Sequence, residues 1–131
     1  MISMILSTAV FSREDPNQTL TVQGGFLGEE YITYDVYSAT TDLDYKLLES
    51  HTGGTDFWVD LKVGEKYLIV FTTQSGDMKC LYVDAEESGK FLLNVDFTST
   101  SWGQLTYNER RHKYHLKAIS KTKDAHGKKE G

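Results

Sequence analysis

The sequence predicts an all-β protein, a single antiparallel β-sandwich of about seven to eight strands, transthyretin- or Ig-like. Segments suited to strands recur at roughly ten-residue intervals, with glycine-containing turns between them. No window of about a dozen residues holds an apolar repeat with helical spacing. The 131 residues include eight Tyr, six Phe and two Trp, which suits one domain with one aromatic-rich core.

Residues 1–18 are expected to form a first strand or a packing arm. The run MISMILSTAVF at residues 1–11 has no Lys or Arg ahead of its short apolar part, unlike a signal peptide. No segment approaches the roughly 18 apolar residues that a membrane-spanning helix needs. We therefore expect a protein made in the cytoplasm and not inserted into a membrane.

Four strands are expected in the next part of the chain. Residues 19–24 alternate and run into a Gly-Gly turn, and residues 31–37 are rich in β-branched and aromatic side chains. Residues 45–48 form a short piece that is closed by the turn sequence HTGG. Residues 57–61 place three apolar side chains on one face.

Four further segments complete the predicted sandwich over residues 19–119. In residues 67–71 the side chains of Tyr67, Ile69 and Phe71 share one face. A turn with Gly76 leads into the next strand, and the remaining strands are expected in the three segments 78–83, 90–97 and 111–119. Residues 120–131 are expected to be a basic, polar tail.

The stretch of roughly residues 20–84 resembles the carboxypeptidase regulatory-like domains of the transthyretin (pre-albumin) group. The matching core and turn positions are Gly54, Phe57, Leu61, Lys66, Tyr67, Ile69, Phe71 and Gly76. The resemblance implies a seven-stranded sandwich in which two of these strands form a central hairpin. Domains of that group usually have no catalysis of their own and serve as folding, spacing or adhesion modules.

Charge is divided unequally along the chain. Residues 1–109 hold six basic and 17 acidic groups, whereas residues 110–131 hold eight basic and two acidic groups. The acidic body argues against nucleic acid as its partner, while the basic end suits an acidic protein surface or phosphate. A solvated tail that aids solubility is the alternative. The tail lysines expected to make contacts are Lys121, Lys123, Lys128 and Lys129.

Four aromatic side chains are candidate contact residues. Alternation turns Trp58 away from the core if its neighbours Phe57 and Val59 face inward. The same argument places Tyr31 and Tyr37 on an outer face, and Trp102 lies in a polar segment, residues 99–103, that is expected to be a loop. Such residues anchor protein interfaces or stack on sugars, unless another part of the chain covers them.

Metal ligands are poorly supported by spacing. His112 and His115 fall on opposite faces of a strand, so they cannot share a metal ion there. Asp42 and Asp44 lack the bend glycine and closing glutamate of an EF-hand loop. We assign no metal and no cofactor.

Catalytic signatures are also weak. Cys80 lies in an alternating strand, where a buried thiol that acts as a small apolar group is the usual case. Asp56 and Asp60 resemble a glycosidase pair only in residue type, since outward aspartates on a strand give the same letters. No serine lies in a G-x-S-x-G sequence.

The sequence therefore predicts a non-enzymatic structural or interaction module. The expected role is a small subunit or decoration protein that packs into a larger protein assembly, for which the virion of a tailed phage is one setting. The expected partners are other protein subunits, either copies of itself or different chains. The alternative function is a carbohydrate- or surface-binding module that uses exposed aromatic residues.

Overall fold

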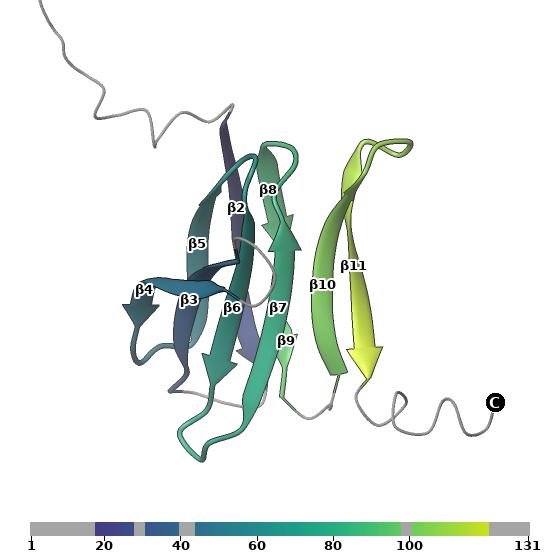
Figure 1. Cartoon of the computed structure of the whole chain (residues 1–131). Coiled ribbons are helices and arrows are strands. Elements are labelled where there is room, and N and C mark those ends of the chain that lie inside the picture. The colour runs from purple at the N-terminus through teal and green to yellow at the C-terminus, as the bar shows by residue number, and fades with distance from the viewer. Residues whose placement is uncertain (1–17, 28–30, 40–43, 98–100, 121–131) are drawn as a thin grey trace, which may run out of the picture.

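The computed structural model describes residues 18–27, 31–39, 44–97 and 101–120 (Figure 1). These residues form strands and no α-helix, so the predicted all-β class is confirmed. No helix in this part of the chain is long and apolar enough to cross a membrane. The strands are β2 (Thr19–Leu27), β3 (Thr33–Ala39), β4 (Tyr45–His51), β5 (Asp56–Lys62), β6 (Lys66–Thr72), β7 (Met78–Asp84), β8 (Gly89–Leu92), β9 (Val95–Asp96), β10 (Ser101–Asn108) and β11 (Lys113–Ser120).

The strands build two sheets that pack face to face. The large sheet has the order β11-β10-β7-β6-β3-β4, and the small sheet has the order β5-β2-β8. β9 pairs with the end of β2, beyond the stretch that pairs with β8. In Figure 1 the large sheet lies in front of the small one, and β10 and β11 continue to the right beyond β8. The small sheet therefore covers only part of the large one.

The two sheets are mixed, whereas purely antiparallel sheets were expected. β10 runs parallel to β7, and β2 runs parallel to both β8 and β9. After β7 the chain crosses to the small sheet, passes back along the domain as β8 and β9, and returns to the large sheet as β10. Because the chain has already run back along the domain in the small sheet, β10 starts at the same end as β7 and pairs parallel to it.

The prediction of a loop over residues 99–103 is wrong for residues 101–103, which lie in a strand. Ser101 and Trp102 belong to β10, where Trp102 is paired with Ile119 of β11. β10 was missed because its sequence, SWGQLTYN, is half polar and does not alternate cleanly. Its pairing with both β7 and β11 makes it a strand.

The expected strand over residues 90–97 is divided into β8 and β9. The backbone N–H of Leu93 donates to the carbonyl oxygen of Gln23 at 2.9 Å, but the side-chain Oδ1 of Asn94 accepts from the N–H of Gly25 at 3.2 Å. A side chain thus replaces the next backbone partner of β2. This substitution interrupts the ladder between the two short strands.

The core between the sheets is centred on aromatic rings. The ring centroids of Phe57 and Phe71 lie 4.9 Å apart, and Phe26 lies 5.5 Å from Phe57. Tyr67, Ile69 and Phe71 are 7%, 0% and 1% exposed, which confirms the inward face predicted for this strand.

Two tyrosines of the large sheet reach across to β5, an edge strand of the small sheet. The hydroxyl of Tyr34 accepts from the backbone N–H of Trp58 at 3.4 Å, and that of Tyr67 accepts from the N–H of Lys62 at 3.0 Å. Burial raises the pKa of both tyrosines, and these hydrogen bonds partly oppose it. The side chains therefore occupy backbone donors that an edge strand would otherwise offer to another chain.

Candidate interaction surface

The outer face of the large sheet carries a row of apolar side chains that crosses four strands. Tyr82 of β7 lies opposite Leu68 of β6, and Leu68 lies opposite Tyr37 of β3. Tyr37 in turn lies opposite Leu47 of β4. Leu47 is 52% exposed, and the other three side chains are partly buried.

A second apolar pair lies beside this row, where Val70 of β6 faces Cys80 of β7. On the far side of the row, Lys66 and Asp84 form an ion pair of 3.8 Å, so charged groups border the apolar area. Cys80 is only partly buried, which corrects the expectation of a fully buried thiol. The outer apolar surface, as we call it below, consists of Tyr37, Leu47, Leu68, Val70, Cys80 and Tyr82.

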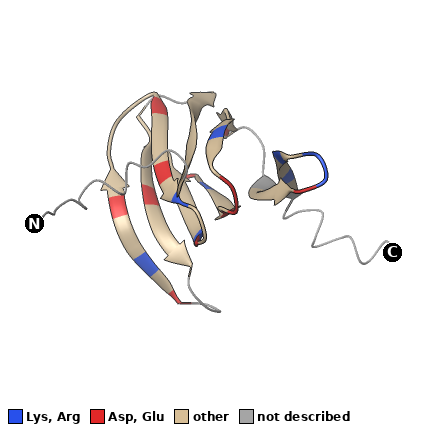
Figure 2. Ribbon diagram, turned by 90° about the horizontal axis from the view of Figure 1, so that it is seen from above, with Lys and Arg blue, Asp and Glu red and all other residues tan. Residues whose placement is uncertain are grey.

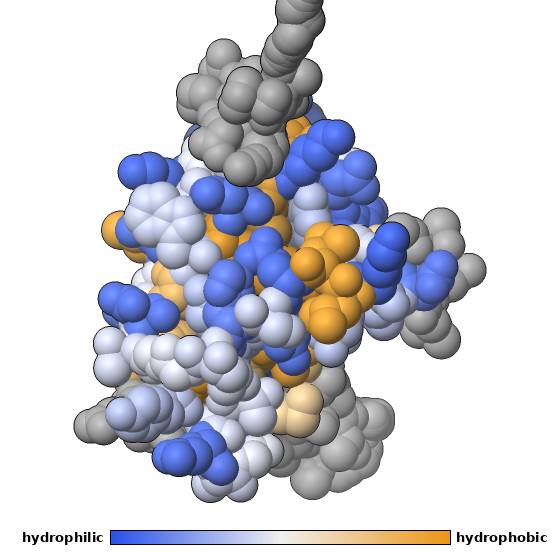
Figure 3. Space-filling model, turned by 90° about the vertical axis from the view of Figure 1, so that its left-hand side faces the viewer, coloured by the Kyte–Doolittle hydropathy of each residue, from blue (hydrophilic) through white to orange (hydrophobic). Residues whose placement is uncertain are grey.

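The edge strand β4 extends this surface, because every residue in it is exposed. A bulge interrupts its register with β3 between Val36 and Tyr37. The side chain of Tyr45 forms a hydrogen bond with Tyr82, and burial raises the pKa of Tyr82. Figure 3 looks onto the left-hand side of the molecule in Figure 1, where β4 lies, and shows apolar side chains exposed among hydrophilic ones.

The sequence also carries a signal for this surface, in the strand that becomes β6. Residues 67–71 read YLIVF, so this strand is apolar on both faces instead of alternating. Such a continuous run is typical of a strand that is covered on both sides. The small sheet covers its inner face, whereas the side chains of Leu68 and Val70 on the outer face remain partly exposed.

The predicted contact residues do not form one site. Trp58 and Tyr31 are 52% and 63% exposed, as alternation predicted for Trp58, and Tyr37 lies on the outer apolar surface. Of Trp102 only the backbone is described. The four tail lysines lie outside the described residues: Lys121, Lys123, Lys128 and Lys129.

Trp58 borders an open hollow at the end of the small sheet. Its indole Nε1 donates to Asp60 at 3.1 Å, and the Nζ of Lys90 lies 5.8 Å from the ring centroid. Asp56 and Gln23 line the same hollow. The buried Oε1 of Gln23 has no hydrogen-bond partner within the described part of the chain. The groups that a ligand could reach here are the half-exposed Trp58 ring and the exposed Asp56, a combination that suits a hydroxyl-rich ligand.

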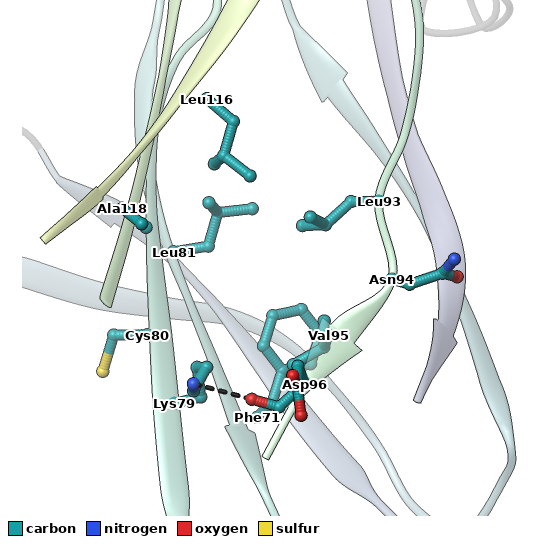
Figure 4. Close-up of a pocket in the computed structure, with 11 residues that line it drawn as sticks. Phe71, Lys79, Cys80, Leu81, Leu93, Asn94, Val95, Asp96, Leu116 and Ala118 are labelled. Atoms are coloured by element: carbon teal, nitrogen blue, oxygen red, sulfur yellow. Dashed lines mark hydrogen bonds between the residues drawn. The ribbon is translucent and has the colours of Figure 1, made fainter. Parts of the chain in front are cut away.

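A half-open, mostly apolar cavity of about 130 Å³ lies between the two sheets beside β8 and β9 (Figure 4). Leu81, Leu93 and Leu116 point toward it from three different segments. At its lower end in the view, the Nζ of Lys79 donates to the carbonyl oxygen of Asp96 at 2.7 Å. Burial lowers the pKa of Lys79, and the Asp96 carboxylate partly opposes this shift.

Titratable groups are scattered over the described surface. No three His, Cys, Asp or Glu side chains gather there in a way that would hold a metal ion. His112 lies in the turn before β11, with a φ of 56°, and not in the expected strand, while His115 is an exposed residue of β11. Asp44, Asp56 and Asp60 are all exposed, and Asp42 lies outside the described residues.

Basic side chains gather where β10 turns into β11. Arg110, Arg111 and Lys113 are all exposed there, and Figure 2 shows this turn at the side of the molecule away from β4 and β5. The basic stretch that begins at residue 110 thus starts on the outermost hairpin of the large sheet.

Comparison with known proteins supports no family. No family model matches the chain, and no curated protein is similar to it in sequence. Among solved structures, the NMR structure of a protein from Eubacterium rectale is 12% identical. The structural match covers 81% of this chain and 91% of the chain of that protein, with a TM-score of 0.32.

Proposed function

We propose that the protein is a non-enzymatic structural subunit that packs into a larger protein assembly, with the outer apolar surface as its contact face. The observation that carries this proposal is the two-sided apolar character of β6. A sandwich needs apolar residues only on the inner face of each sheet. The apolar side chains of Leu68 and Val70 on the outer face are not needed for the core, so they are available for contact with a partner.

The partner that fits this face best is a second copy of the chain. The body, residues 1–109, is acidic and the following residues are basic, so each copy offers the charge that its neighbour attracts. The edge strand β4 contributes Leu47 to this surface, at 52% exposure, and its neighbour Leu48, at 49% exposure, adds to the apolar area available. Apolar contact supplies affinity, and opposite charges guide the encounter.

We further propose that the domain is a carboxypeptidase regulatory-like module. The turn and core residues of the hairpin β5–β6, which match the pattern of that group, support this proposal. Modules of this kind act by being positioned among other domains or subunits. A virion of a tailed phage is a setting in which such a subunit would serve.

Light scattering after size exclusion, over a range of protein concentrations, tests self-association. We expect the wild-type chain to associate as concentration rises, and Leu47→Glu to weaken association by about tenfold or more. Leu27→Glu is the matched control, because Leu27 is 49% exposed but belongs to the small sheet. A chain that stays monomeric throughout, or equal effects of the two variants, would overturn the proposal.

Carbohydrate binding at the Trp58 hollow is the second candidate function. It is favoured by one observation, the half-exposed indole of Trp58 at the rim of the hollow, which its hydrogen bond to Asp60 holds in place. A glycan array should then show saturable binding that Trp58→Ala removes and Trp58→Phe partly keeps. A blank array with the folded wild-type protein would refute this candidate.

A further inference from the structure

The free edge of β8 is the starting point. β8 has β2 on one side and no described strand on the other. The hairpin β10–β11 of the large sheet continues past this edge in both views (Figures 1 and 2). The small sheet therefore ends at β8, while the large sheet that it packs against continues through β10 and β11.

Apolar side chains are left partly uncovered at this step. Leu116 of the hairpin and Leu93 of the segment between β8 and β9 pack against the core but stay partly exposed. Both line the half-open cavity of about 130 Å³, as do Leu81 and Val95 (Figure 4). An added strand beside β8 would cover these residues and close the cavity.

Residues 2–11 have the sequence that such a strand requires. Four of the five even positions are apolar, Ile2, Met4, Leu6 and Val10, whereas the odd positions include two serines. One apolar face and one mixed face are typical of an edge strand in a sandwich.

The position of β2 brings this segment to the right place. Leu20, the second residue of β2, pairs with Gly89, the first residue of β8. Because β2 and β8 are parallel, a chain that reverses direction just before β2 runs antiparallel to β8. The carbonyl oxygen of Gln18 is held by the N–H of Val63, so residues 12–17 need to step across two strand spacings, roughly 10 Å, which a chain of that length spans.

We propose that residues 2–11 pair with the free edge of β8 in the same molecule and place their even-numbered side chains over the cavity. Ten residues extend about 33 Å, which is enough to follow residues 89–96 from end to end. The short tether gives the segment a high effective concentration at its own β8. This inference goes beyond the proposed function and does not depend on it.

Disulfide trapping tests the pairing directly. Leu92 is 71% exposed on the outward side of β8, so it should lie near an odd-numbered residue of the added strand. In a Cys80→Ser background, Leu92→Cys combined with Ser7→Cys or Ala9→Cys should oxidise to a monomer with an internal disulfide. The control pairs Ser7→Cys with Gln74→Cys, an exposed turn residue, and should not cross-link. Disulfide-linked dimers, or no cross-link in either Leu92→Cys variant, would overturn the proposal.

Hydrogen exchange supplies a second test without new cysteines. Amides of residues 89–96 should exchange about tenfold more slowly in the full chain than in a chain that starts at Ser12. Leu6→Asp should abolish this protection, whereas Ile5→Asp, the neighbour on the other face, should retain it. Equal exchange in the full and shortened chains would contradict the pairing.

Discussion

The side-chain hydroxyl of Tyr114 donates a hydrogen bond to the carbonyl oxygen of Glu87 at 2.6 Å and accepts one from the N–H of the same residue at 2.8 Å. It also accepts from the N–H of Glu86 at 3.0 Å. One phenol on β11 thus holds the loop between β7 and β8. These hydrogen bonds connect β11, an edge strand of the large sheet, to the residues just before β8 of the small sheet.

Tyr114→Phe should lower the free energy of unfolding by about 1–2 kcal/mol, because three hydrogen bonds are lost and the freed backbone groups can turn to water. Urea unfolding monitored by circular dichroism measures the change. Tyr107→Phe is the control, since its ring packs 5.1 Å from that of Tyr114 without holding this loop. Equal losses in both variants would show that the loop contact contributes little.

Stability should fall at alkaline pH. Burial raises the pKa of Tyr34, Tyr67 and Tyr114 in the folded chain above the usual value of about 10. Their contribution is complete below about pH 10 and is lost as the pH rises toward the folded-state values, because the unfolded chain ionises first. Unfolding free energies measured between about pH 8 and 11 should show this decline, with a shallower slope in Tyr67→Phe. An equal slope in that variant would argue against the buried phenol as the cause.

Gly24→Ala should destabilise the protein by at least about 2 kcal/mol, because a methyl group at residue 24 would lie only 1.5 Å from the carbonyl oxygen of Leu93. At the adjacent Gly25 the nearest atom to such a methyl group is 3.6 Å away, so Gly25→Ala serves as the control and should be nearly neutral. Thermal unfolding of the two variants compares them. Equal melting temperatures would mean that the segment at Leu93 moves aside easily.

Phe71→Ala should cost about 3–5 kcal/mol of stability, as a large-to-small change at a ring that contacts Phe26, Tyr34 and Phe57. Val70→Ala, on the outer face of the same strand, should cost about 1 kcal/mol. Denaturant midpoints test this difference. A reversed order would place the core on the wrong side of β6.

Removal of residues 121–131 should leave the sandwich folded and reduce self-association. Ala125 is the one apolar side chain in that segment, so folding has little to lose. Exposed ion pairs are worth about 0–1 kcal/mol each and are screened by salt, so the loss should be larger at low than at high ionic strength. Sedimentation velocity at several salt concentrations measures it. Unchanged association of the shortened chain at every ionic strength would reduce the tail to an aid to solubility.

Local sequence was sufficient to predict strands with strong alternation. Phe57, Val59 and Leu61 are 3%, 1% and 2% exposed, as their spacing required. β10 was not predictable in this way, since its strand character comes from partners at residues 81–83 and 113–120. The division of β8 from β9 depends on Asn94, whose side chain binds a backbone group far away in the sequence.

The candidate surface was only partly predictable for a related reason. Tyr37 was identified by alternation, but its neighbours Leu68 and Tyr82 become neighbours only through the register of three strands. A pattern within one strand shows which face a residue occupies and not what lies beside it. The continuous run YLIVF was the available sign that the outer face is apolar.

The pairing of β2 has a consequence for the order of events during synthesis. β2 leaves the ribosome before every other described strand, yet its partners β5, β8 and β9 end at Lys62, Leu92 and Asp96. At about 5–20 residues per second, Leu20 and Val22 stay without their final neighbours for several seconds. The hairpin β6–β7 needs no such wait, because its strands are consecutive. Nascent chains should therefore carry β2 unpaired until β5 emerges and complete its pairing only once β8 has followed, which makes β2 the segment that a chaperone would shield.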